Sequence, residues 1–386
     1  MAFVLSSQNI FEYLFEHNLC AQEEKELGQL EPKFAKNFNL LVSLSDERKL
    51  LVKQERYISE GKTAGEFANE WRIQEFLERF PELSYIRRWL PEVLHFNAEN
   101  SIIVFNYLND YRDLADFYAK ENVFPTAIAT TIGTILATIH RATFQRQQYK
   151  DFLAQNGNQA SSLRFAQLIR TLDRVTPEVF GLVPADGLKF FALYQRYDSL
   201  GQAIAELGSA FAPCCLTHND VKLNNILLHA DWERSGDSMV RLIDWECCSW
   251  GDPALDLGKL IASYLQIWLS SLVISKALSI EESLHLAMTP LEQLQPSMAA
   301  LTKAYLDTFP DILEYRPDFL RRVVQFAGFA LIQQIQAMIQ YVKSFGNAGI
   351  AMLQIAKTLL CRPEQSMPTM FGTCAAELTQ YSPSAA

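Results

Sequence analysis

Two aspartates and an asparagine in the middle of the chain have the spacing that phosphoryl transfer needs. Asp220 lies two residues after His218, Asn225 follows five residues later, and Asp244 comes directly after a short apolar run. Phosphoryl transfer needs one carboxylate that positions the attacking hydroxyl, together with separate oxygen ligands for a divalent metal. Asp220 is therefore the candidate catalytic residue, and Asn225 and Asp244 are the candidate metal ligands.

The segments around these residues predict short strands. Residues 214–217, 226–228 and 239–243 are apolar runs, and a polar loop separates the first two. We expect this arrangement to bring Asp220 and Asp244 to one edge. The alternative is that both acids are turn residues that satisfy local backbone groups, which short acidic side chains do well. The two segments taken together favour the catalytic interpretation.

These motifs resemble those of the aminoglycoside phosphotransferase and choline kinase-like superfamily, small-molecule kinases with the two-lobed protein-kinase-like fold. Three segments are similar to its catalytic and metal-binding motifs: His218-Asn219-Asp220, Asn225-Ile226-Leu227 and Ile243-Asp244-Trp245-Glu246. The resemblance implies that ATP, with Mg²⁺, donates its γ-phosphoryl group to an alcohol group of an acceptor. It also implies that Asp256 braces the catalytic loop from behind and that His218 supports this loop.

The segment after Asp244 predicts a helix and indicates a small acceptor. Asp252 is a good helix N-cap and Pro253 suits the first helical position. Only a few residues separate Asp244 from this helix start, and no Ala-Pro-Glu element follows. Since the activation segment of a protein kinase does not fit here, we expect a small-molecule hydroxyl as the acceptor.

The first hundred residues predict the elements that would clamp ATP. Apolar stretches at 40–44 and 50–53 flank a polar turn and indicate a hairpin whose second strand ends at Lys53. The spacing of apolar residues over 64–80 then predicts a helix, with Thr63 as its candidate N-cap. The resemblance implies that Lys53 contacts the ATP phosphates. The simpler alternative for Lys53 is a solvated lysine at a strand end.

Glu70, on the predicted helix, is our choice for the ion-pair partner that orients Lys53. Glu66 and Glu75 remain competitors, because one sequence does not fix the rotation of the helix about its axis. The simpler alternative for Glu70 is a surface charge.

A second predicted hairpin, with strands at 93–96 and 102–108, ends in residues that resemble the hinge between the two lobes. Phe105 and Tyr107 are therefore candidate ATP-binding residues. Backbone groups of this segment would pair with the adenine edge, so the identity of the side chains should matter little.

The expected phosphate-binding loop departs from the family pattern. Glycines normally let backbone amides approach phosphates closely, yet residues 30–39 contain no glycine. Lys33 or Lys36 could supply positive charge instead. The absence of glycine from this loop supports an alternative function, a catalytically silent kinase-fold module that binds nucleotide or a partner. The intact set of two acids and an amide argues against that alternative.

Lys222, two residues after Asp220, occupies a position where small-molecule kinases of this type often have histidine. We class it with Asp220 as a candidate catalytic residue, because its charge could neutralise negative charge that develops on the transferred phosphate. The alternative is a solvated loop lysine.

Composition excludes several classes of function. The chain of 386 residues has a formal net charge of −10, which disfavours nucleic-acid binding. Residues 1–7 lack the positive region of a signal peptide, so we expect a cytoplasmic protein. The apolar stretches at 260–274 and 323–342 predict buried helices rather than membrane spans. Seven cysteines without a Cys-x-x-Cys motif predict reduced thiols.

Together these patterns predict an α+β protein with two lobes and a tail. Residues 1–108 would form an ATP-clamping lobe with a small antiparallel sheet, and residues 109–361 a mainly helical lobe that carries catalysis and acceptor binding. Residues 362–386 look like a flexible tail. The acceptor should bind between helices within 263–340 and near 108–118. No pattern identifies the acceptor or indicates an oligomeric state.

Overall fold

The computed structural model divides the chain into two compact units. Unit 1 contains Met1–Leu114 and Asn225–Cys248, and unit 2 contains Ala115–Asn224 and Ser249–Ala386. The structure describes residues 3–24, 28–33, 36–45, 47–58, 63–154, 165–167, 169, 172, 185–273, 278, 282–283 and 286–380. Each unit is therefore formed by two separate stretches of the chain.

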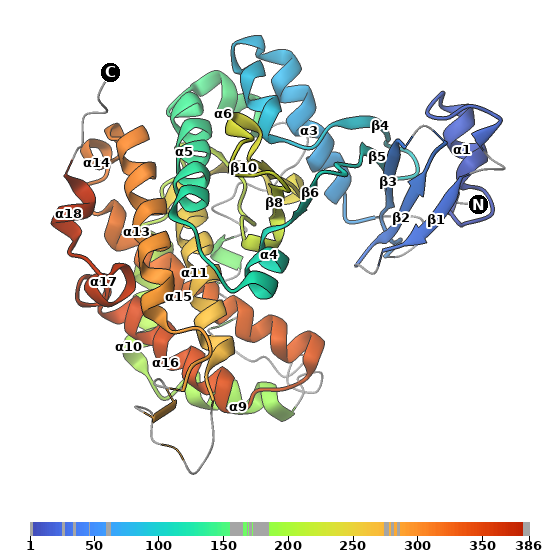
Figure 1. The fold of residues 1–386 in the computed structure, drawn as a ribbon. Coiled ribbons are helices and arrows are strands. Elements are labelled where there is room, and N and C mark those ends of the chain that lie inside the picture. Colours follow the sequence, from blue (N-terminus) through green and yellow to red (C-terminus); the bar gives the residue numbers. More distant parts are fainter. Residues whose placement is uncertain are drawn as a thin grey trace. The chain divides into compact units, whose positions relative to one another are not determined.

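Unit 1 contains a five-stranded antiparallel sheet in the order β1-β2-β3-β5-β4. Its strands are β1 (Gln29–Pro32), β2 (Phe38–Ser43), β3 (Lys49–Gln54), β4 (Val93–Asn97) and β5 (Ile102–Asn106). Both predicted hairpins are confirmed, since β2 pairs with β3 and β4 pairs with β5. Figure 1 shows α1 (Ile10–Glu16) beside this sheet.

Successive side chains along each strand point to opposite faces of the sheet, and the two faces pack against different elements. Leu50 and Val52 of β3 pack with Ile10 and Leu14 of α1 in one apolar cluster. The intervening residue, Leu51, packs in a second cluster, which includes Phe67 of α3 (Glu66–Arg79). Since side chains two residues apart share a face, Lys53 lies on the face that α3 covers.

The predicted helix over 64–80 is confirmed as α3, but its N-terminal cap differs from Thr63, the residue that the sequence suggested. The N-cap residue is Gly65, with φ of 75°. The buried carboxylate of Glu55 accepts hydrogen bonds from the backbone N–H groups of Gly65 and Phe67. A tertiary contact from the end of β3 therefore satisfies amides that a local Thr63 cap would have served. A 3₁₀ helix, η1 (Pro81–Trp89), follows α3.

The strands predicted at 214–217, 226–228 and 239–243 are also present. In unit 1, β8 (Ile226–His229) lies between β6 (Tyr111–Asp113) and β9 (Val240–Leu242). In unit 2, β7 (Cys215–Thr217) pairs with β10 (Ser249–Gly251). The predicted boundary at residue 108 placed residues 225–248 in the helical lobe. In the structure, the β6-β8-β9 ladder joins these residues to the unit formed by the N-terminal part of the chain.

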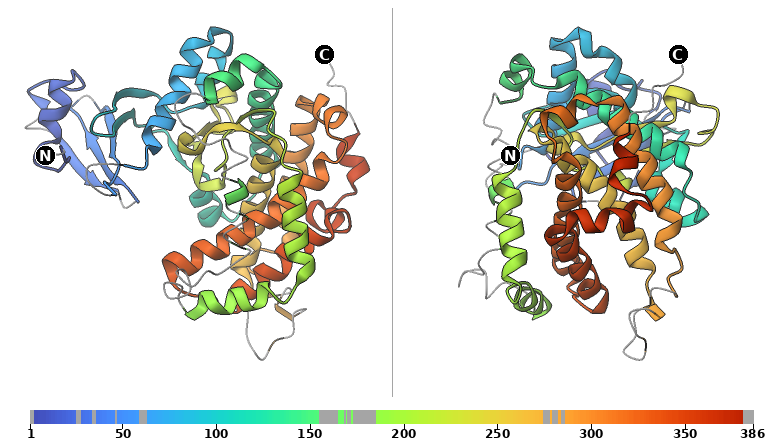
Figure 2. Two further views of the ribbon diagram at one scale, coloured as in Figure 1. Left: turned by 180° about the vertical axis from the view of Figure 1, so that it is seen from behind. Right: turned by 90° about the vertical axis from the view of Figure 1, so that its left-hand side faces the viewer.

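Unit 2 is mainly helical, and Figure 2 shows its helices from two sides. They are α4 (Leu114–Glu121), which begins at the boundary, α5 (Thr126–Thr143), α6 (Gln147–Ala154), α9 (Ala185–Tyr194), α10 (Asp198–Ser209), α11 (Pro253–Ser271), α13 (Leu291–Thr308), α14 (Asp311–Tyr315), α15 (Phe319–Ala337), α16 (Asn347–Cys361), α17 (Pro363–Phe371) and α18 (Ala375–Thr379), with a π-helical turn, η6 (Met338–Val342), after α15.

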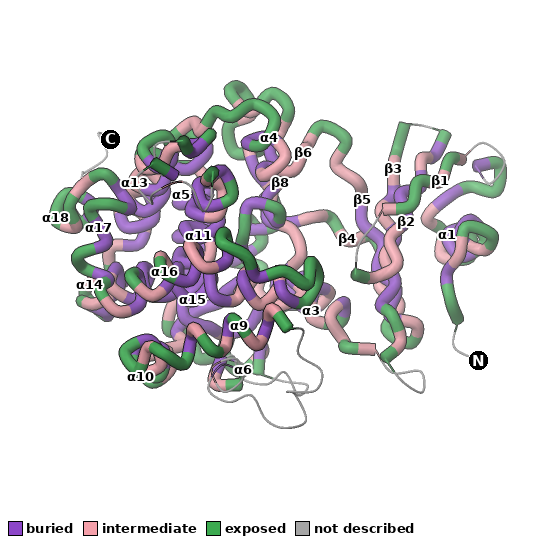
Figure 3. The backbone as a smooth tube through the Cα atoms, turned by 90° about the horizontal axis from the view of Figure 1, so that it is seen from below, coloured by how far each residue is buried: buried purple, intermediate pink, exposed green. Residues whose placement is uncertain are grey.

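Helices α11 and α15 form the core of unit 2 and are buried along most of their length (Figure 3). They approach closely at Gly258, where an added Cβ would lie 2.7 Å from the backbone oxygen of Val323. The predicted buried helices are thus confirmed. In the described part of the chain, no helix combines the length and apolar character needed to cross a bilayer.

The prediction of a flexible tail after residue 361 is wrong for the described residues 362–380. This segment forms α17 and α18, and Met367, Met370, Phe371 and Leu378 are buried. Pro363 begins α17 and Gly372 ends it in the left-handed region, with φ of 67°. The Pro, Ser and Thr content suggested a tail, but three of the apolar residues recur at helical spacing and pack against unit 2. Residues 381–386 lie outside the described part.

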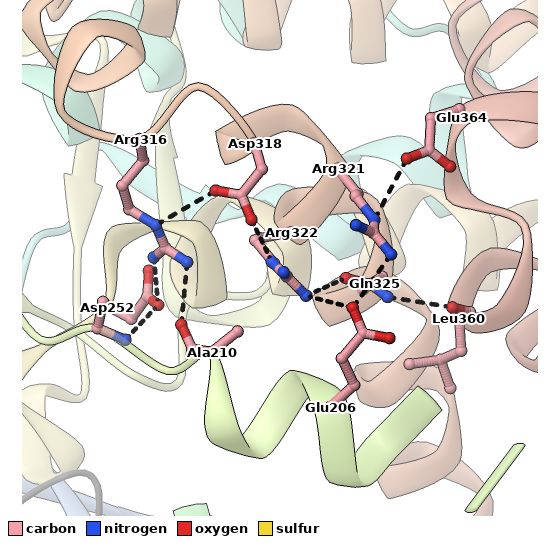
Figure 4. A network of polar contacts seen from close by, with 11 residues as sticks. Glu206, Ala210, Asp252, Arg316, Asp318, Arg321, Arg322, Gln325, Leu360 and Glu364 are labelled. Carbon is pink, nitrogen blue, oxygen red and sulfur yellow. Dashed lines mark hydrogen bonds and ion pairs between the residues drawn. The ribbon is translucent and has the colours of Figure 1, made fainter. Parts of the chain in front are cut away.

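A network of ion pairs joins α10, the start of α11, α15 and α17 in unit 2 (Figure 4). Asp252 caps α11, since its carboxylate accepts from the Ala254 amide at 3.0 Å. The same buried carboxylate pairs with Arg316 at 2.6 Å, and Arg316 also donates to the Ala210 carbonyl. Arg321 bridges Glu206 and Glu364 at the more exposed end of the network. The N-terminus of α11 is therefore fixed by a buried charge pair.

We expect Arg316→Ala to lower the free energy of unfolding by about 3–5 kcal/mol, because it leaves the carboxylate of Asp252 buried without its partner. Chemical denaturation followed by circular dichroism measures this change. The matched control is Arg321→Ala, which removes more exposed ion pairs and should cost no more than about 1 kcal/mol. Equal losses in the two variants would contradict the importance of the buried pair.

Candidate active site

Unit 1 contains a cavity of about 220 Å³ beside the predicted hinge. It is lined by Leu51, Lys53, Glu70, Pro91, Phe105, Asn106, Tyr107, Leu108, Tyr111, Arg112, Asp113, Leu227, Ile243 and Asp244. The strands β3, β5 and β6, the start of β8 and the segment after β9 supply most of these residues, so the sheet pairing described above builds the cavity. Of the six predicted site residues that lie in unit 1, five line this cavity, and Asn225 does not.

Two of the three backbone amides at positions 106–108 of the predicted hinge donate hydrogen bonds within unit 1. The Asn106 amide donates to the Glu92 carbonyl at 3.0 Å, and the Tyr107 amide donates to the Lys49 carbonyl at 2.9 Å. Within the described residues, the Leu108 amide donates no hydrogen bond. Leu108 therefore presents a backbone donor at the wall of the cavity, as recognition of the edge of a heterocyclic base requires.

The side chains of Phe105 and Tyr107 differ in their surroundings. Phe105 is 4% exposed and packs with Phe67 and Ile103, and Lys53 lies over its ring with Nζ 5.2 Å from the centroid. Tyr107 is half-buried at the cavity wall. Phe105 thus supports the lysine through a cation–π contact in addition to lining the cavity.

Lys53 forms an ion pair with Asp244, whose carboxylate oxygen lies 2.8 Å from Nζ. Strand alternation turns Lys53 toward α3. Asp244 follows β9 in the left-handed region, with φ of 61°, a conformation that short acidic residues tolerate. Burial alone would lower the pKa of Lys53, but Asp244, Glu70 and Glu246 more than offset this effect and raise it. The ammonium therefore stays charged.

The predicted ion pair between Lys53 and Glu70 is not formed within 4.0 Å, because Asp244 takes the direct contact with the lysine. Glu70 is nevertheless buried on the α3 face nearest Lys53. Burial raises the pKa of Glu70 to about 7, while Lys53 and a weaker contribution from the Trp245 amide act in the opposite direction. Glu70 acts on Lys53 through its charge rather than through contact.

The two competing glutamates have other partners. Lys36 and Asn37 contact the carboxylate of Glu66. Glu75 accepts from the indole N–H of Trp71 at 3.1 Å on the exposed face of α3. The rotation of the helix, which sequence did not fix, therefore selects Glu70 as the glutamate that faces Lys53.

Lys33 and Lys36 in the glycine-free loop each contact a carboxylate. Lys33 pairs with Glu31 at 2.5 Å, and Lys36 pairs with Glu66. The Lys33 amide donates to the Asn39 carbonyl at 3.0 Å, which extends the pairing of β1 and β2. Residues 34 and 35 lie outside the described part.

Asn225 and Asp244 lie close together in unit 1 because of the β8-β9 ladder. Ile226 pairs with Leu242, and the Ile243 amide donates to the Asn225 carbonyl at 3.0 Å. Asp244 is the next residue. An amide oxygen and a carboxylate are hard ligands that suit Mg²⁺. Among the described residues, no group of three or more His, Cys, Asp or Glu side chains could hold a metal by itself. An Mg²⁺ ion here would therefore need other oxygens to complete its coordination.

The charges around Asp244 also fit a cation. Burial, together with the neighbouring carboxylates of Glu66 and Asp244, raises the pKa of Glu246 to about 7. Asp244 contributes to the raised pKa of Glu70 in the same way. The negative charge around Asp244 thus exceeds what Lys53 neutralises. A divalent cation bound here would reduce the repulsion between these carboxylates.

Unit 2 contains a larger cavity of about 900 Å³, which the predicted residues Asp220 and Lys222 help to line. Asp220 accepts from Lys222 at 2.8 Å and lies 3.7 Å from the ammonium of Lys259. Burial raises the pKa of Asp220, but the charges of Lys259 and Lys222 outweigh this effect and lower it. Asp220 is thus kept ionised and able to accept a proton.

The loop that carries Asp220 is held by Asp256, which lies one turn into α11. The buried Asp256 carboxylate accepts from the backbone amides of His218 and Asn219, both at 2.7 Å. His140 forms a hydrogen bond with the same carboxylate through Nε2 at 3.2 Å and another with the Tyr305 hydroxyl through Nδ1 at 2.9 Å. This geometry confirms the bracing role that the resemblance implied for Asp256.

Lys259 and His140 were missed by the sequence analysis. Lys259 lies about one turn after Asp256 on α11 and donates to the Asn219 carbonyl at 2.5 Å. A predicted helix start at Asp252 could have indicated that positions 256 and 259 share a face. No local pattern could have connected His140 with Asp256, because the two residues are separated by 116 positions and meet only in the folded unit.

The predicted site residues therefore fall into two groups, one in each unit. Lys53, Glu70, Phe105, Tyr107, Asn225 and Asp244 belong to unit 1, and Asp220 and Lys222 belong to unit 2. The seven cysteines are free thiols, as expected. Burial raises the pKa of Cys215 well above its usual value, so this thiol is unreactive.

Comparison with known structures identifies the fold as that of the kinase-like proteins. The structure of a Plasmodium vivax ethanolamine kinase matches with a TM-score of 0.56 and 14% identity, covering 96% of this chain and 92% of that one. A choline/ethanolamine kinase family protein from Mesorhizobium loti matches with a TM-score of 0.51 and 16% identity, covering 94% and 99%. These similarities establish a two-lobed α+β fold.

A family comparison extends this result from fold to family. Residues 36–278 match the model of the phosphotransferase enzyme family, APH, and the chain belongs to that family. It is also similar to the 4-hydroxytryptamine kinase of Psilocybe cyanescens, with 24% identity over 179 residues. That match covers 45% of this chain and 46% of the relative, so it spans about half the length of the relative.

The raised pKa of Glu70 predicts how stability depends on pH. Because the folded protein binds this proton more tightly than the unfolded chain, the free energy of unfolding should fall as pH rises from about 4.5 to about 7. In Glu70→Gln this fall should be shallower. The part of the fall that remains should come from Glu246, whose pKa is also raised to about 7. Thermal unfolding across this pH range measures the effect. Glu75→Gln, on the exposed face of the same helix, should keep the wild-type slope. An unchanged slope in Glu70→Gln would contradict the assignment.

Proposed function

We propose that this protein is an ATP-dependent kinase that transfers the γ-phosphoryl group to a hydroxyl of a small molecule. The observation that carries the proposal is the position of Asp220, an ionised carboxylate at the wall of a cavity of about 900 Å³. A cavity of this size suits a small molecule. Membership of a phosphotransferase family and similarity to proteins named as kinases support the same reaction.

Asp220 would orient the acceptor hydroxyl and accept its proton. As the hydroxyl oxygen forms a bond to the γ-phosphorus, the bond between that phosphorus and the β,γ-bridging oxygen breaks and ADP leaves. The lowered pKa keeps Asp220 ionised, so that its carboxylate can accept a hydrogen bond from the acceptor hydroxyl, and the support of its loop by Asp256 keeps it in position. Lys222 and Lys259 would hold the carboxylate in position, and Lys222 would add positive charge near the transferred group.

The cavity of unit 1 would hold the nucleotide. The Leu108 amide and the side chains around it would receive adenine, and Lys53 would contact the phosphates. Asn225 and Asp244 would hold Mg²⁺, which neutralises phosphate charge when it is bound. Glu70 would keep the ammonium of Lys53 directed toward this site through its charge.

The alternative is a catalytically silent module that binds nucleotide. The specific observation in its favour is the glycine-free loop, whose lysines contact Glu31 and Glu66. Nucleotide-dependent thermal stabilisation without phosphate transfer to any acceptor would support this alternative. The retention of Asp220, Asn225 and Asp244 argues for catalysis, since a silent module needs none of them.

We expect Asp220→Asn to lower turnover about 10²–10⁴-fold, because it removes the proton acceptor. Its affinity for ATP, measured by calorimetry, should remain close to that of the wild type. The assay is transfer of labelled γ-phosphate from ATP to a pool of hydroxylated metabolites and antibiotics. Asp311→Asn, an exposed substitution elsewhere in unit 2, serves as the control and should leave turnover unchanged. Wild-type turnover in Asp220→Asn would contradict the role of this carboxylate.

We expect Lys53→Met to weaken ATP binding about 30-fold or more, because a buried cation that contacts the phosphates is removed. Calorimetric titration with ATP and Mg²⁺ measures the dissociation constant. The matched control is Lys120→Met, which removes an exposed lysine that pairs with Asp116. An unchanged dissociation constant in Lys53→Met would exclude Lys53 from the nucleotide site.

A further inference from the structure

The polar groups around the cavity beside Asp220 have a distinct composition. The described lining residues are Ala115, Ala119, Asp220, Val221, Lys222, Leu223, Asn224, Lys259, Ser263, Gln266, Ile267, Ser270, Ser271, Met288, Ala330, Gln333, Gln334 and Ala337. Two lysines and one aspartate give this wall a net charge of +1. The remaining polar side chains are amides and hydroxyls.

This lining is poorly suited to an acceptor that carries an ammonium group. Proteins bind such cations with carboxylates or with the faces of aromatic rings. Among the described lining residues, Asp220 is the only carboxylate and no side chain is aromatic. Asp220 already contacts Lys222 at 2.8 Å and lies 3.7 Å from Lys259. Two lysines would therefore repel a cationic acceptor, and the carboxylate that could attract it is already paired with these lysines.

The two lysines are equally poorly placed for an anionic acceptor. Lys222 donates to Asp220, and Lys259 donates to the Asn219 carbonyl at 2.5 Å. Both ammonium groups are thus directed at the loop that carries Asp220. An acceptor carboxylate would have to displace these contacts and would lie beside the Asp220 carboxylate, which repels it.

Three glutamines offer the hydrogen bonds that hydroxyl groups need. Gln266 projects from α11, and Gln333 and Gln334 project from α15. Within the described part of the chain, their side chains make no hydrogen bond, and each is half-buried at the cavity wall. A carboxamide both donates and accepts, as a hydroxyl does, so amides match a molecule with several hydroxyls.

Small residues leave the space that such a molecule would occupy. Ala330 and Ala337 flank the two glutamines of α15 at intervals of three to four residues, so they lie on the same side of the helix. On α11, Ser263 and Ser270 lie one turn before and one turn after Gln266. Amides and small side chains therefore alternate along both helices.

We propose that the acceptor is a neutral polyhydroxylated molecule, a sugar or polyol, bound by Gln266, Gln333 and Gln334. This inference rests on the proposed kinase function. It separates this protein from relatives whose names give 4-hydroxytryptamine, ethanolamine or choline as substrates, since each of those molecules carries an amine or a quaternary ammonium group.

The test compares three sets of acceptors on the full chain with ATP and Mg²⁺. The neutral set contains glucose, ribose, glycerol and myo-inositol; the cationic set contains choline, ethanolamine, 4-hydroxytryptamine and kanamycin; the anionic set contains glycerate and gluconate. Acceptor-dependent ADP release and the mass of the product are measured. We expect kcat/KM for the best neutral acceptor to exceed that for every charged one by about 100-fold. A charged compound as the best acceptor would overturn the inference.

Binding measured by calorimetry separates this inference from the proposed function. A neutral polyol that binds without being phosphorylated would support the inference and would count against kinase activity. If no member of the neutral set binds or reacts, the inference is overturned, whatever the charged sets show.

Substitution of the amides gives an independent measurement. Gln333→Leu should weaken binding of the best neutral polyol about 10-fold, because one hydrogen-bonding amide is lost. Gln336→Leu, on the same helix but outside the cavity lining, is the matched control and should bind the polyol as the wild type does. Gln333→Glu should raise the affinity for choline relative to the wild type. If Gln333→Leu and the wild type bind the polyol equally, this amide does not take part in recognition.

Discussion

The carboxylate of Asp256 is the constraint on which the conformation of the Asp220 loop depends. It lies in the core of unit 2 and accepts backbone hydrogen bonds from His218 and Asn219, the two residues before Asp220. Burial raises the pKa of Asp256, but His140 and the His218 amide outweigh this effect and lower it. A buried ionised acid that is fully hydrogen-bonded holds the loop in one conformation, and the proposed role of Asp220 in positioning a hydroxyl requires that rigidity.

The position of Asp256 depends in turn on the start of α11. Asp252 caps this helix and is paired with Arg316, which is connected to α10 through the Ala210 carbonyl. Lys259 extends from the same helix to the Asn219 carbonyl. One helix thus supports the Asp220 loop through a carboxylate and an ammonium, and its later turns form a wall of the cavity beside Asp220. The stability of unit 2 and the shape of this cavity therefore depend on the same element.

The cavity of unit 1 is organised by strand alternation and by charge. Lys53 reaches α3 because it shares a face of β3 with Leu51, and Asp244 reaches Lys53 because the β8-β9 ladder ends beside it. The surrounding carboxylates keep the lysine charged, and burial leaves Glu70 with a pKa of about 7. The charge states of Lys53 and Glu70 are therefore set by burial and by charged groups on other elements.

The sequence by itself determined the local elements and the candidate chemistry. Apolar stretches separated by short polar turns predicted the hairpins of β2-β3 and β4-β5, helical spacing predicted α3, and capping residues predicted the start of α11. These features depend on neighbouring residues, so one sequence suffices to find them. The spacing of Asp220, Asn225 and Asp244 indicated phosphoryl transfer for the same reason.

Only the tertiary structure decided which distant side chains meet. It selected Glu70 over Glu66 and Glu75, gave Lys53 the direct partner Asp244, and brought His140 and Lys259 to the Asp220 loop. It also folded residues 363–371 and 375–379 into helices, although the composition of this segment indicated a tail. The physical reason is that helix rotation, strand pairing and burial depend on contacts between segments far apart in the chain, which local patterns do not specify.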